Sequence, residues 1–261
     1  MAGALTPEEL DGDRLDRSRR VGWIDVDAVR SKRCLVVGAG ALGNEVVKNL
    51  LLSGFGSVTI VDMDRVALTN LNRCMFFTSE DAELKRSKAL VLSERARHLN
   101  PDASVFAFDS RIESIPAGVL REHDLVFGCL DNVGARLHLN AHAYHLRIPF
   151  IDGGTLGTRG KVQVVVPPDS PCLQCATNRT HAKVLEKRFS CSGNDVSYFQ
   201  PRFAAEITTT SIIAALQVRE GLKLASGHED DCIAHILYYD GLRNAYETVE
   251  VSRDPECPVH A

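Results

Sequence analysis

One glycine-rich turn between two apolar segments constrains the fold of this chain more than any other stretch. Gly38, Gly40 and Gly43 follow the apolar run that begins at Cys34, and a second apolar run ends at Asp62. Between a strand and a helix, glycines at this spacing allow a tight turn, close approach of a phosphate and close packing of the helix. The helix N-terminus can receive an anion, and Asp62 stands where a carboxylate meets a ribose. The motif predicts a nucleotide site; the alternative is a close helix–strand contact without a ligand.

Strand-like and helical segments alternate through the first half of the chain. Further apolar runs predict strands of the same sheet at 58–62, 105–108, 125–130 and 149–154. Helical patterns lie between them, at about 84–99 and up to about residue 146. Regular alternation of this kind is typical of a doubly wound parallel sheet. We therefore expect an α/β fold with a doubly wound, mostly parallel, Rossmann-like sheet.

The pattern changes in the second half. Segments at 160–167, 234–241 and 247–251 alternate like antiparallel strands that extend the sheet, and 207–225 predicts an apolar helix for a core or an interface. Residues 176–205 show little periodicity, and a loop of that length in a compact domain is more often functional than not. No linker divides the chain, so we expect a single domain. Its predicted parts are an N-terminal arm and helix at 1–33, a nucleotide-binding part at 34–155 and an antiparallel extension at 156–261.

The composition argues against several classes of protein. A hydrophobic content of 44% and a charged content of 25% are ordinary for a globular chain, and a net charge of -4 gives no nucleic-acid footprint. No apolar run is long enough for a membrane span, and the N-terminus lacks a signal pattern. We expect a cytoplasmic protein with no nucleic-acid or membrane partner. Its eight cysteines are then expected to be metal ligands, nucleophiles or buried thiols rather than disulfides.

Three charged residues stand where a phosphate chain needs them. Arg73 lies in the polar loop after the second strand, Lys88 at the start of the next helix, and Asp131 at the end of the fourth strand. Two cations can neutralise phosphate charge and a carboxylate can hold Mg²⁺, which fits the cleavage of a triphosphate. Each residue also has an alternative role: a surface ion pair for Arg73, a helix-surface lysine for Lys88 and a helix N-cap for Asp131.

Two pairs of cysteine and histidine residues predict a zinc site. Cys172 and Cys175 are separated by two residues, as are Cys257 and His260. Each pair can therefore bind one face of a tetrahedral Zn²⁺, and together they would staple the tail of the chain to its body. The alternative is a redox C-x-x-C motif and an unrelated tail.

Cys191 lies in the long loop close to Lys187 and Arg188. Nearby cations lower the pKa of a thiol and favour the nucleophilic thiolate. The residues alone leave three roles open: a nucleophile, an alternative zinc ligand or an incidental loop cysteine. Three other cysteines lie in or beside strand-like runs and are expected to be buried: Cys34, Cys129 and Cys232.

Together these motifs resemble the E1-like adenylating family, which comprises the ubiquitin-activating enzymes and the bacterial activators of sulfur-carrier proteins for molybdopterin and thiamine synthesis. The resemblance runs from about Arg14 to His260. It rests on motifs in a fixed order: Gly38-Ala-Gly-Ala-Leu-Gly, Asp62-Met-Asp, Asn70-Leu-Asn-Arg73, Leu130-Asp-Asn132 followed by Arg136 and Asn140, Cys172-Leu-Gln-Cys175, Tyr239-Asp-Gly-Leu-Arg and Asp254-Pro-Glu-Cys-Pro.

The resemblance implies a role for each candidate residue. Asp131 would bind Mg²⁺, and Arg14 is similar to an arginine finger that reaches the phosphates from the partner subunit of a dimer. His260 would be the fourth zinc ligand, where the family usually has cysteine. Lys85 remains an alternative to Lys88, because the segment before Lys88 lacks the family's usual glycine. ATP would be surrounded by Gly38, Gly40, Gly43, Asp62, Asp64, Asn70, Arg73 and Lys88.

The resemblance also implies the activity. It predicts a minimal, homodimeric E1-like enzyme that adenylates, with MgATP, the C-terminal glycine of a ubiquitin-like protein ending in Gly-Gly. Cys191 occupies a place similar to that of the catalytic cysteine in the compact E1 of the ubiquitin-fold modifier pathway. It would form a thioester for transfer to an E2-like conjugating enzyme. The alternatives are a sulfur-carrier-protein adenylyltransferase without a thioester step, a non-catalytic scaffold subunit of a heterodimer, and a dehydrogenase.

Overall fold

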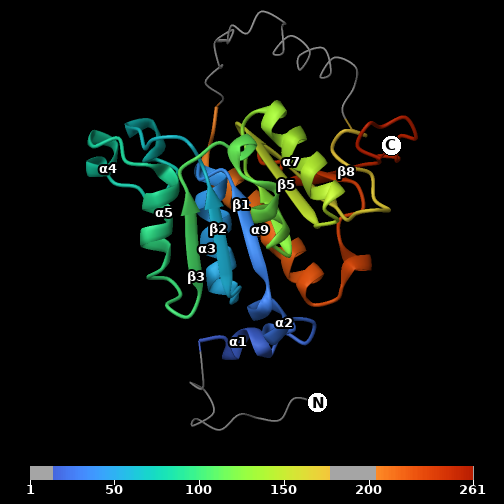
Figure 1. Cartoon of the computed structure of the whole chain (residues 1–261), viewed down its shortest axis with the longest axis horizontal. Helices are drawn as coiled ribbons and strands as arrows, with labels where there is room; N and C mark the ends of the chain where they lie inside the picture. Colours follow the sequence, from blue (N-terminus) through green and yellow to red (C-terminus); the bar gives the residue numbers. More distant parts are fainter. Residues whose placement is uncertain (1–13, 177–203, 261) are drawn as a thin grey trace, which may run out of the picture.

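The computed structural model describes residues 14–176 and 204–260 (Figure 1). Its strands form one sheet in the order β3-β2-β1-β4-β5-β6-β7-β8. Five neighbouring strands are parallel: β1 (Arg33–Val37), β2 (Ser57–Val61), β3 (Ser104–Phe108), β4 (Leu125–Gly128) and β5 (Phe150–Leu156). Three antiparallel strands extend the sheet: β6 (Arg159–Val165), β7 (Ile236–Asp240) and β8 (Ala245–Val249). The predicted fold class is confirmed.

Helices cover both faces of the sheet (Figure 1). Successive side chains of a strand point to opposite faces, so Val36 and Leu35 of β1 belong to different cores. Val36 belongs to the core that contains residues of α3 (Ala41–Ser53), α5 (Lys88–Ala96) and α9 (Ile207–Ala225). Leu35 belongs to the core that contains residues of α6 (Ala117–Arg121) and α7 (Val133–His145). The remaining α-helices among the described residues are α1 (Asp16–Arg19), α2 (Val26–Ser31) and α4 (Ser79–Glu83).

The helix predicted at 84–99 begins later than expected. Lys85 has a φ of 47°, which a helix cannot contain, and Ser87 is an extended N-cap, so α5 starts at Lys88. The short helix α4 precedes this turn and is capped by Thr78, whose side chain accepts a hydrogen bond from Asp81 N. By contrast, the helix predicted at 207–225 has the expected bounds in α9. Lys88 is therefore the first residue of its helix.

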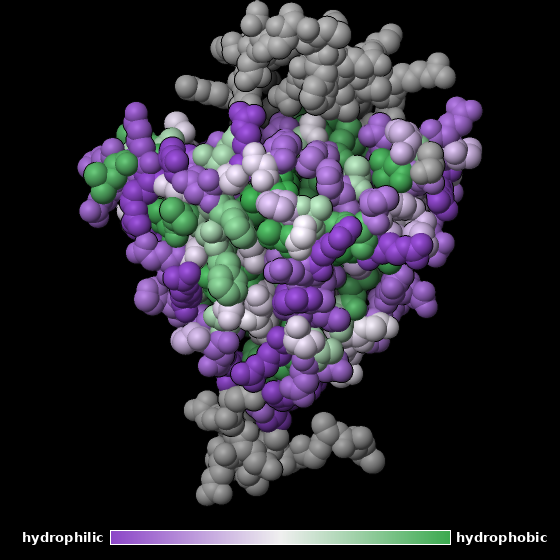
Figure 2. Space-filling view, in the orientation of Figure 1, coloured by the Kyte–Doolittle hydropathy of each residue, from purple (hydrophilic) through white to green (hydrophobic). Residues whose placement is uncertain are grey.

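None of the described helices is both long and apolar enough to cross a membrane. On the face shown in Figure 2, hydrophilic residues predominate and hydrophobic residues form small groups between them. One continuous sheet joins the predicted nucleotide-binding part to the antiparallel extension. The predicted division of the chain into three parts stays a prediction, since residues 177–203 lie outside the described residues.

Candidate functional site

The glycine turn packs as its spacing predicts. Gly38 has a φ of 102°, and a Cβ there would lie 2.4 Å from the carbonyl oxygen of Cys129. A Cβ on Gly43 would lie 1.8 Å from the carbonyl oxygen of Gly38, so the helix and the turn touch through backbone alone. At Gly40, the N-cap of α3, a Cβ would meet nothing within 4 Å. Two glycines therefore serve packing, and the third leaves open space beside a helix N-terminus, as an anion requires.

Asp62 fastens the end of β2 to this turn. One of its carboxylate oxygens accepts a hydrogen bond from Ala39 N at 2.6 Å, and the other accepts one from Asp64 N at 2.7 Å. Burial raises the pKa of this carboxyl, and the nearby positive charge of Lys88 opposes the rise. Each oxygen keeps a further lone pair, so Asp62 can hold the turn and still accept a hydroxyl.

Asn44 is a residue of this site that the sequence reasoning missed. It is fully buried, and its amide donates to the carbonyl oxygens of Ala39 at 2.9 Å and Gly40 at 3.0 Å. Its own carbonyl accepts from Phe76 N at 3.2 Å, which ties the glycine turn to the loop that carries Arg73. The signal was present, because a polar amide stands within an otherwise apolar face of the predicted helix.

Lys88 and Asp64 form an ion pair at the same edge of the sheet. Their Nζ and Oδ2 atoms are 2.8 Å apart, and only 12% of the Lys88 side chain is exposed. Lys85 instead lies exposed in the turn before α5. Between the two lysines, the structure brings Lys88 to the other predicted site residues.

Asn70 and Arg73 shape the loop that follows. The side-chain carbonyl of Asn70 accepts a hydrogen bond from Ala67 N at 2.9 Å and closes a short 3-10 turn at Leu68–Asn70. Arg73 donates to the carbonyl oxygen of Thr69 and to Asn72 Oδ1. Within the described residues no carboxylate pairs with Arg73, so its alternative role as a surface ion pair finds no support there. Its positive charge is available to an anion.

Asp131 is exposed just beyond β4. The N-cap of α7 is Asn132, whose side chain accepts a hydrogen bond from Ala135 N at 2.7 Å. The alternative role of Asp131 as the N-cap is therefore wrong. No hydrogen bond or ion pair joins the Asp131 carboxylate to any residue that the structure describes, so its oxygens are free to bind a cation.

These candidates gather where the strand order reverses. The glycine turn follows β1, Asp62 and Asp64 follow β2, and Asp131 follows β4, all at the carboxyl ends of parallel strands. The sheet reverses its winding between β1 and β4, which touch through Cys129 N and Val37 O at 2.8 Å. Open α/β sheets bind their ligands in the crevice at such a switch point.

Arg14 lies at the opposite edge. Its guanidinium donates to Asn100 Oδ1 and to the carbonyl oxygen of Leu99, two residues that precede β3. This is the amino edge of the parallel strands, beside α1 and α2 in Figure 1. Within one chain the structure therefore does not bring Arg14 to the candidate nucleotide residues.

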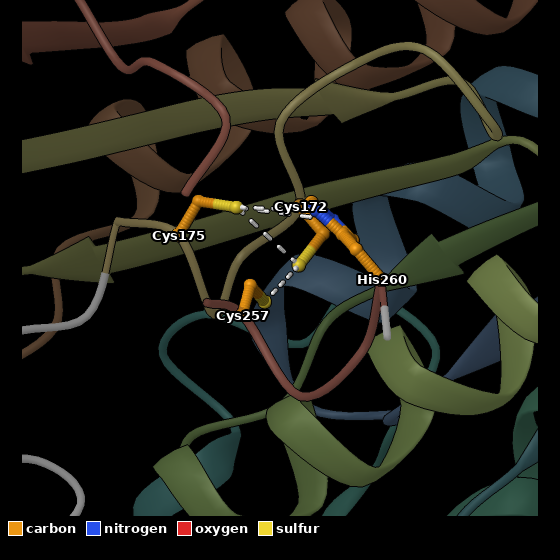
Figure 3. Close-up of side chains that lie close together, drawn as sticks. All are labelled: Cys172, Cys175, Cys257 and His260. Carbon is orange, nitrogen blue, oxygen red and sulfur yellow. Dashed lines mark hydrogen bonds between the residues drawn. The ribbon is translucent and has the colours of Figure 1, made fainter. Parts of the chain in front are cut away.

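The two predicted metal-binding pairs come together in one cluster (Figure 3). The ligand atoms of Cys172, Cys175, Cys257 and His260 all lie within 4.8 Å of one another. Cys172 Sγ is 3.7 Å from Cys257 Sγ and 4.0 Å from Cys175 Sγ, close to the separation of about 3.8 Å that tetrahedral zinc–sulfur bonds require. Burial lowers the pKa of His260, which favours its neutral, metal-binding form. Three sulfurs and one imidazole in this arrangement fit Zn²⁺.

Residues around the cluster orient its ligands. The Tyr144 ring stacks on the His260 ring with centroids 4.6 Å apart. Asn140, one turn earlier on α7, accepts a hydrogen bond from Leu173 N at 2.9 Å and so fixes the loop between Cys172 and Cys175. Sequence reasoning missed Tyr144, although its spacing of four residues from Asn140 places both on one helix face.

Cys191 lies outside the described residues, so its predicted role stays a prediction. The described cysteines outside the metal cluster are all at least partly buried: Cys34, Cys74, Cys129 and Cys232. Burial raises the pKa of Cys74 to about 11 and that of Cys232 to about 12. Neither thiol is a ready nucleophile in this state.

A doubly wound sheet with a glycine turn at its switch point is typical of nucleotide-binding α/β proteins, and comparison with known proteins makes the assignment specific. The sequence profile of the ThiF family matches residues 15–259. The chain belongs to the ThiF family, which confirms the predicted membership of the E1-like adenylating group.

Three similar proteins show how far the likeness extends. The chain is 32% identical to the sulfur carrier protein adenylyltransferase of Thermus thermophilus, with 97% of this chain and 92% of that protein covered. It is 34% identical over 163 residues to the ubiquitin-activating enzyme E1-like of Saccharomyces cerevisiae, a match that covers 61% of this chain but only 25% of the yeast protein. The structure of E. coli MccB with succinimide shares the fold, with a TM-score of 0.76 at 19% identity, covering 98% of this chain and 77% of MccB.

Proposed function

We propose that this chain adenylates the C-terminal carboxylate of a ubiquitin-fold carrier protein that ends in Gly-Gly. Membership of the ThiF family confirms the coarser prediction, an ATP-dependent E1-like adenylyltransferase. One observation carries the finer proposal. Arg73 and Asp131 have no charged partner among the described residues, and both follow strands that end at the edge where Gly40 leaves open space. A triphosphate with its magnesium ion needs both of these groups.

The proposed reaction needs charge neutralisation more than covalent chemistry. An oxygen of the carrier carboxylate attacks the α-phosphorus of ATP, and the bond from that phosphorus to the bridging oxygen breaks. Pyrophosphate leaves with the bonding electron pair, the product is an acyl adenylate, and no proton moves. Lys88 and Arg73 neutralise phosphate charge, and Asp131 holds Mg²⁺, which supplies further neutralisation when bound. The chain thus acts by positioning the reactants.

The step after adenylation separates the predicted E1 activity from its alternative. The similarity over nearly the whole chain is to a sulfur carrier protein adenylyltransferase, whereas the yeast E1-like match covers a quarter of that protein. These comparisons favour the alternative, in which the adenylate passes to a sulfur donor without an enzyme thioester. The thioester on Cys191 and transfer to an E2-like enzyme remain the second candidate, supported by the cations near Cys191 in the sequence.

We also propose that the chain acts as a homodimer. Arg14 lies at the amino edge of the sheet and the nucleotide residues lie at the carboxyl edge. If Arg14 contacts phosphates as an arginine finger, it must do so in another subunit. The proposed cofactors are ATP with Mg²⁺ at the edge site and a structural Zn²⁺ at the cluster of Cys172, Cys175, Cys257 and His260.

Exchange of radiolabelled pyrophosphate into ATP tests the proposed function. Each ubiquitin-fold protein with a Gly-Gly terminus from the same genome is supplied to the purified chain. We expect exchange that requires one such carrier, its terminal carboxylate and Mg²⁺. Absence of exchange with every carrier would instead support the scaffold alternative, and binding of NADH would support a dehydrogenase.

A further inference from the structure

A group of charged side chains lies buried on the α7 side of β5 and β6, apart from the residues assigned to the nucleotide. Asp152 of β5 is fully buried, at 0% exposure. One carboxylate oxygen, Oδ1, lies 3.4 Å from Arg136 Nε, and the other, Oδ2, lies 3.6 Å from Lys161 Nζ. Arg136 belongs to α7 and Lys161 to β6, so three separate elements meet at this carboxylate.

The group is not a saturated polar core. Among the described residues, none donates a hydrogen bond to either oxygen of Asp152, and Arg136 Nε has no acceptor within hydrogen-bond geometry. Gln163, which faces Asp152 across the β5–β6 pair, is also buried and has both side-chain polar atoms unpartnered there. Each buried polar group without a partner costs about 1–3 kcal/mol. Apolar residues of similar volume are often at least as stabilising as a buried ion pair, so stability alone does not explain these charges.

The side chains of the two cations are more exposed to solvent than the carboxylate that they flank. The side chain of Lys161 is 29% exposed and that of Arg136 is 16% exposed, whereas Asp152 is closed to solvent. Two positive charges against one negative charge leave a net positive charge at the surface. Burial lowers the pKa of Lys161, and the charge of Asp152 opposes this effect. Asp152 thus helps to keep the ammonium group protonated.

Two glycines of β5 fix the guanidinium of Arg136. Its Nη2 donates a hydrogen bond to the carbonyl oxygen of Gly153. A Cβ on Gly154 would lie 2.4 Å from the same nitrogen, so a larger residue there would displace the guanidinium from this position. Gly154 pairs directly with Lys161 in the β5–β6 ladder. The guanidinium of Arg136 therefore occupies the space over Gly154, beside Lys161.

The cationic group adjoins the nucleotide edge. Asp152 pairs with Gly128 at the end of β4, and a Cβ on Gly128 would lie 3.0 Å from an oxygen of Asp152. Asp131 follows that strand, and Arg136 lies in the second turn of α7 just beyond it. Arg136 and Lys161 thus lie beside the strand end from which Asp131 would hold the magnesium of the nucleotide.

We propose that Arg136 and Lys161, positioned by the buried carboxylate of Asp152, bind the C-terminal carboxylate of the carrier protein and hold it for attack on the nucleotide. This inference rests on the proposed function. An arginine and a lysine side by side suit a carboxylate, because charge-assisted hydrogen bonds are strong and guanidinium can bind both oxygens. The opposing interpretation is that the three charges only join α7 to the sheet.

A carrier with its terminal carboxylate converted to a carboxamide separates these interpretations. The probe is the carrier that supports pyrophosphate exchange by the wild type, in its acid and amide forms, titrated by calorimetry without nucleotide. We expect the wild type to bind the acid about tenfold more tightly than the amide, or by about 1.4 kcal/mol. Lys161→Gln should lose most of this preference, and Lys161→Arg should restore it. Lys223→Gln is the matched control, because Lys223 is also partly buried and pairs with Glu220.

Asp152→Asn tests the positioning role. It should raise the KM for the carrier about tenfold and leave the KM for ATP unchanged, whatever its effect on thermal stability. A purely structural role predicts a lower unfolding temperature with both KM values and the acid-to-amide ratio as in the wild type. That result, or an unchanged ratio in Lys161→Gln, overturns the inference while the proposed function stands. If no carrier supports exchange by the wild type, the proposed function fails and the inference fails with it.

Discussion

The ammonium group of Lys88 lies 2.8 Å from a carboxylate oxygen of Asp64, which joins the first residue of α5 to the loop after β2. This contact favours Lys88 over Lys85 as the lysine that meets the phosphates. Lys88 is held at the carboxyl edge of the sheet with 12% of its side chain exposed, and Lys85 lies in an exposed turn. A phosphate that enters the edge would compete with Asp64 for the same ammonium group.

Lys88→Ala should therefore abolish carrier-dependent pyrophosphate exchange, by about 100-fold or more, because the phosphates lose a neutralising charge. Stability should change by less than about 1 kcal/mol, since the partner Asp64 is half exposed. Lys85→Ala is the control and should exchange at nearly the wild-type rate. A larger loss in Lys85→Ala than in Lys88→Ala would reverse the assignment.

Asp131→Ala should remove Mg²⁺-dependent exchange without lowering the unfolding temperature, because Asp131 does not cap α7. Asn132→Ala should instead lower stability. It removes the observed N-cap and should cost about 1 kcal/mol of unfolding free energy. Exchange assays and thermal unfolding of both variants check the pair of expectations. Near-normal exchange by Asp131→Ala would contradict its role at the metal.

One Zn²⁺ per chain should be found by elemental analysis. Cys257→Ser should lose this metal and unfold at a lower temperature, because structural zinc contributes directly to folding. Cys232→Ser, at a partly buried cysteine outside the cluster, should keep both metal and stability. His260→Cys should also keep the metal, since thiolate is an equivalent ligand. A metal-free wild type of full stability would rule out the zinc assignment.

Arg14→Ala chains mixed with Asp131→Ala chains should recover about one working site per mixed dimer, since a two-fold dimer presents the same patch from both subunits. The structure motivates this test by holding Arg14 at Leu99 and Asn100, away from the nucleotide residues of its own chain. Arg17→Ala, at an exposed arginine of α1, serves as the control with normal exchange. Failure to recover activity in purified mixed dimers would end the finger hypothesis.

Cys191→Ala decides between the two candidate pathways. The variant should still exchange pyrophosphate, because the thiol takes no part in adenylation. If the wild type forms a carrier conjugate that thiol reductants cleave, this variant should lose it, as judged by gel electrophoresis with and without reductant. Cys232→Ala should not lose it, since burial raises the pKa of that thiol to about 12. A wild type that forms the adenylate but no conjugate with its own carrier would establish the sulfur-carrier alternative.

The features that the sequence predicted correctly depend on residues close together in the chain. The glycine turn and the two metal-binding pairs are local patterns whose spacing determines their geometry. Their neighbours in space are not local. The start of α5 depends on Lys85 in a left-handed conformation and on Asp81, which binds Arg86 and Arg95 across the turn. No periodicity in the sequence encodes that cluster.

The charged group at Asp152 escaped prediction for a related reason. Its three members come from a helix and two strands, and they meet only because α7 packs on β5 and β5 pairs with β6. A single Asp within a strand pattern carries no sign of burial. The sequence also could not predict where Arg14 lies within its own chain. The family resemblance implied only that Arg14 acts in a second subunit.

The metal cluster has a consequence for the topology of the chain. Cys172 and Cys257 are 85 positions apart, and a bound ion would close the intervening chain into a ring. Closing such a ring lowers the entropy of the unfolded chain, which raises the free energy of that state by about 4 kcal/mol. The folded state is stabilised relative to it by the same amount. The ring contains α9, β7 and β8, and α9 packs on α3 at the opposite face of the sheet from α7. One ion bound on the α7 side would thus restrain a segment whose helix α9 covers the opposite face of the sheet.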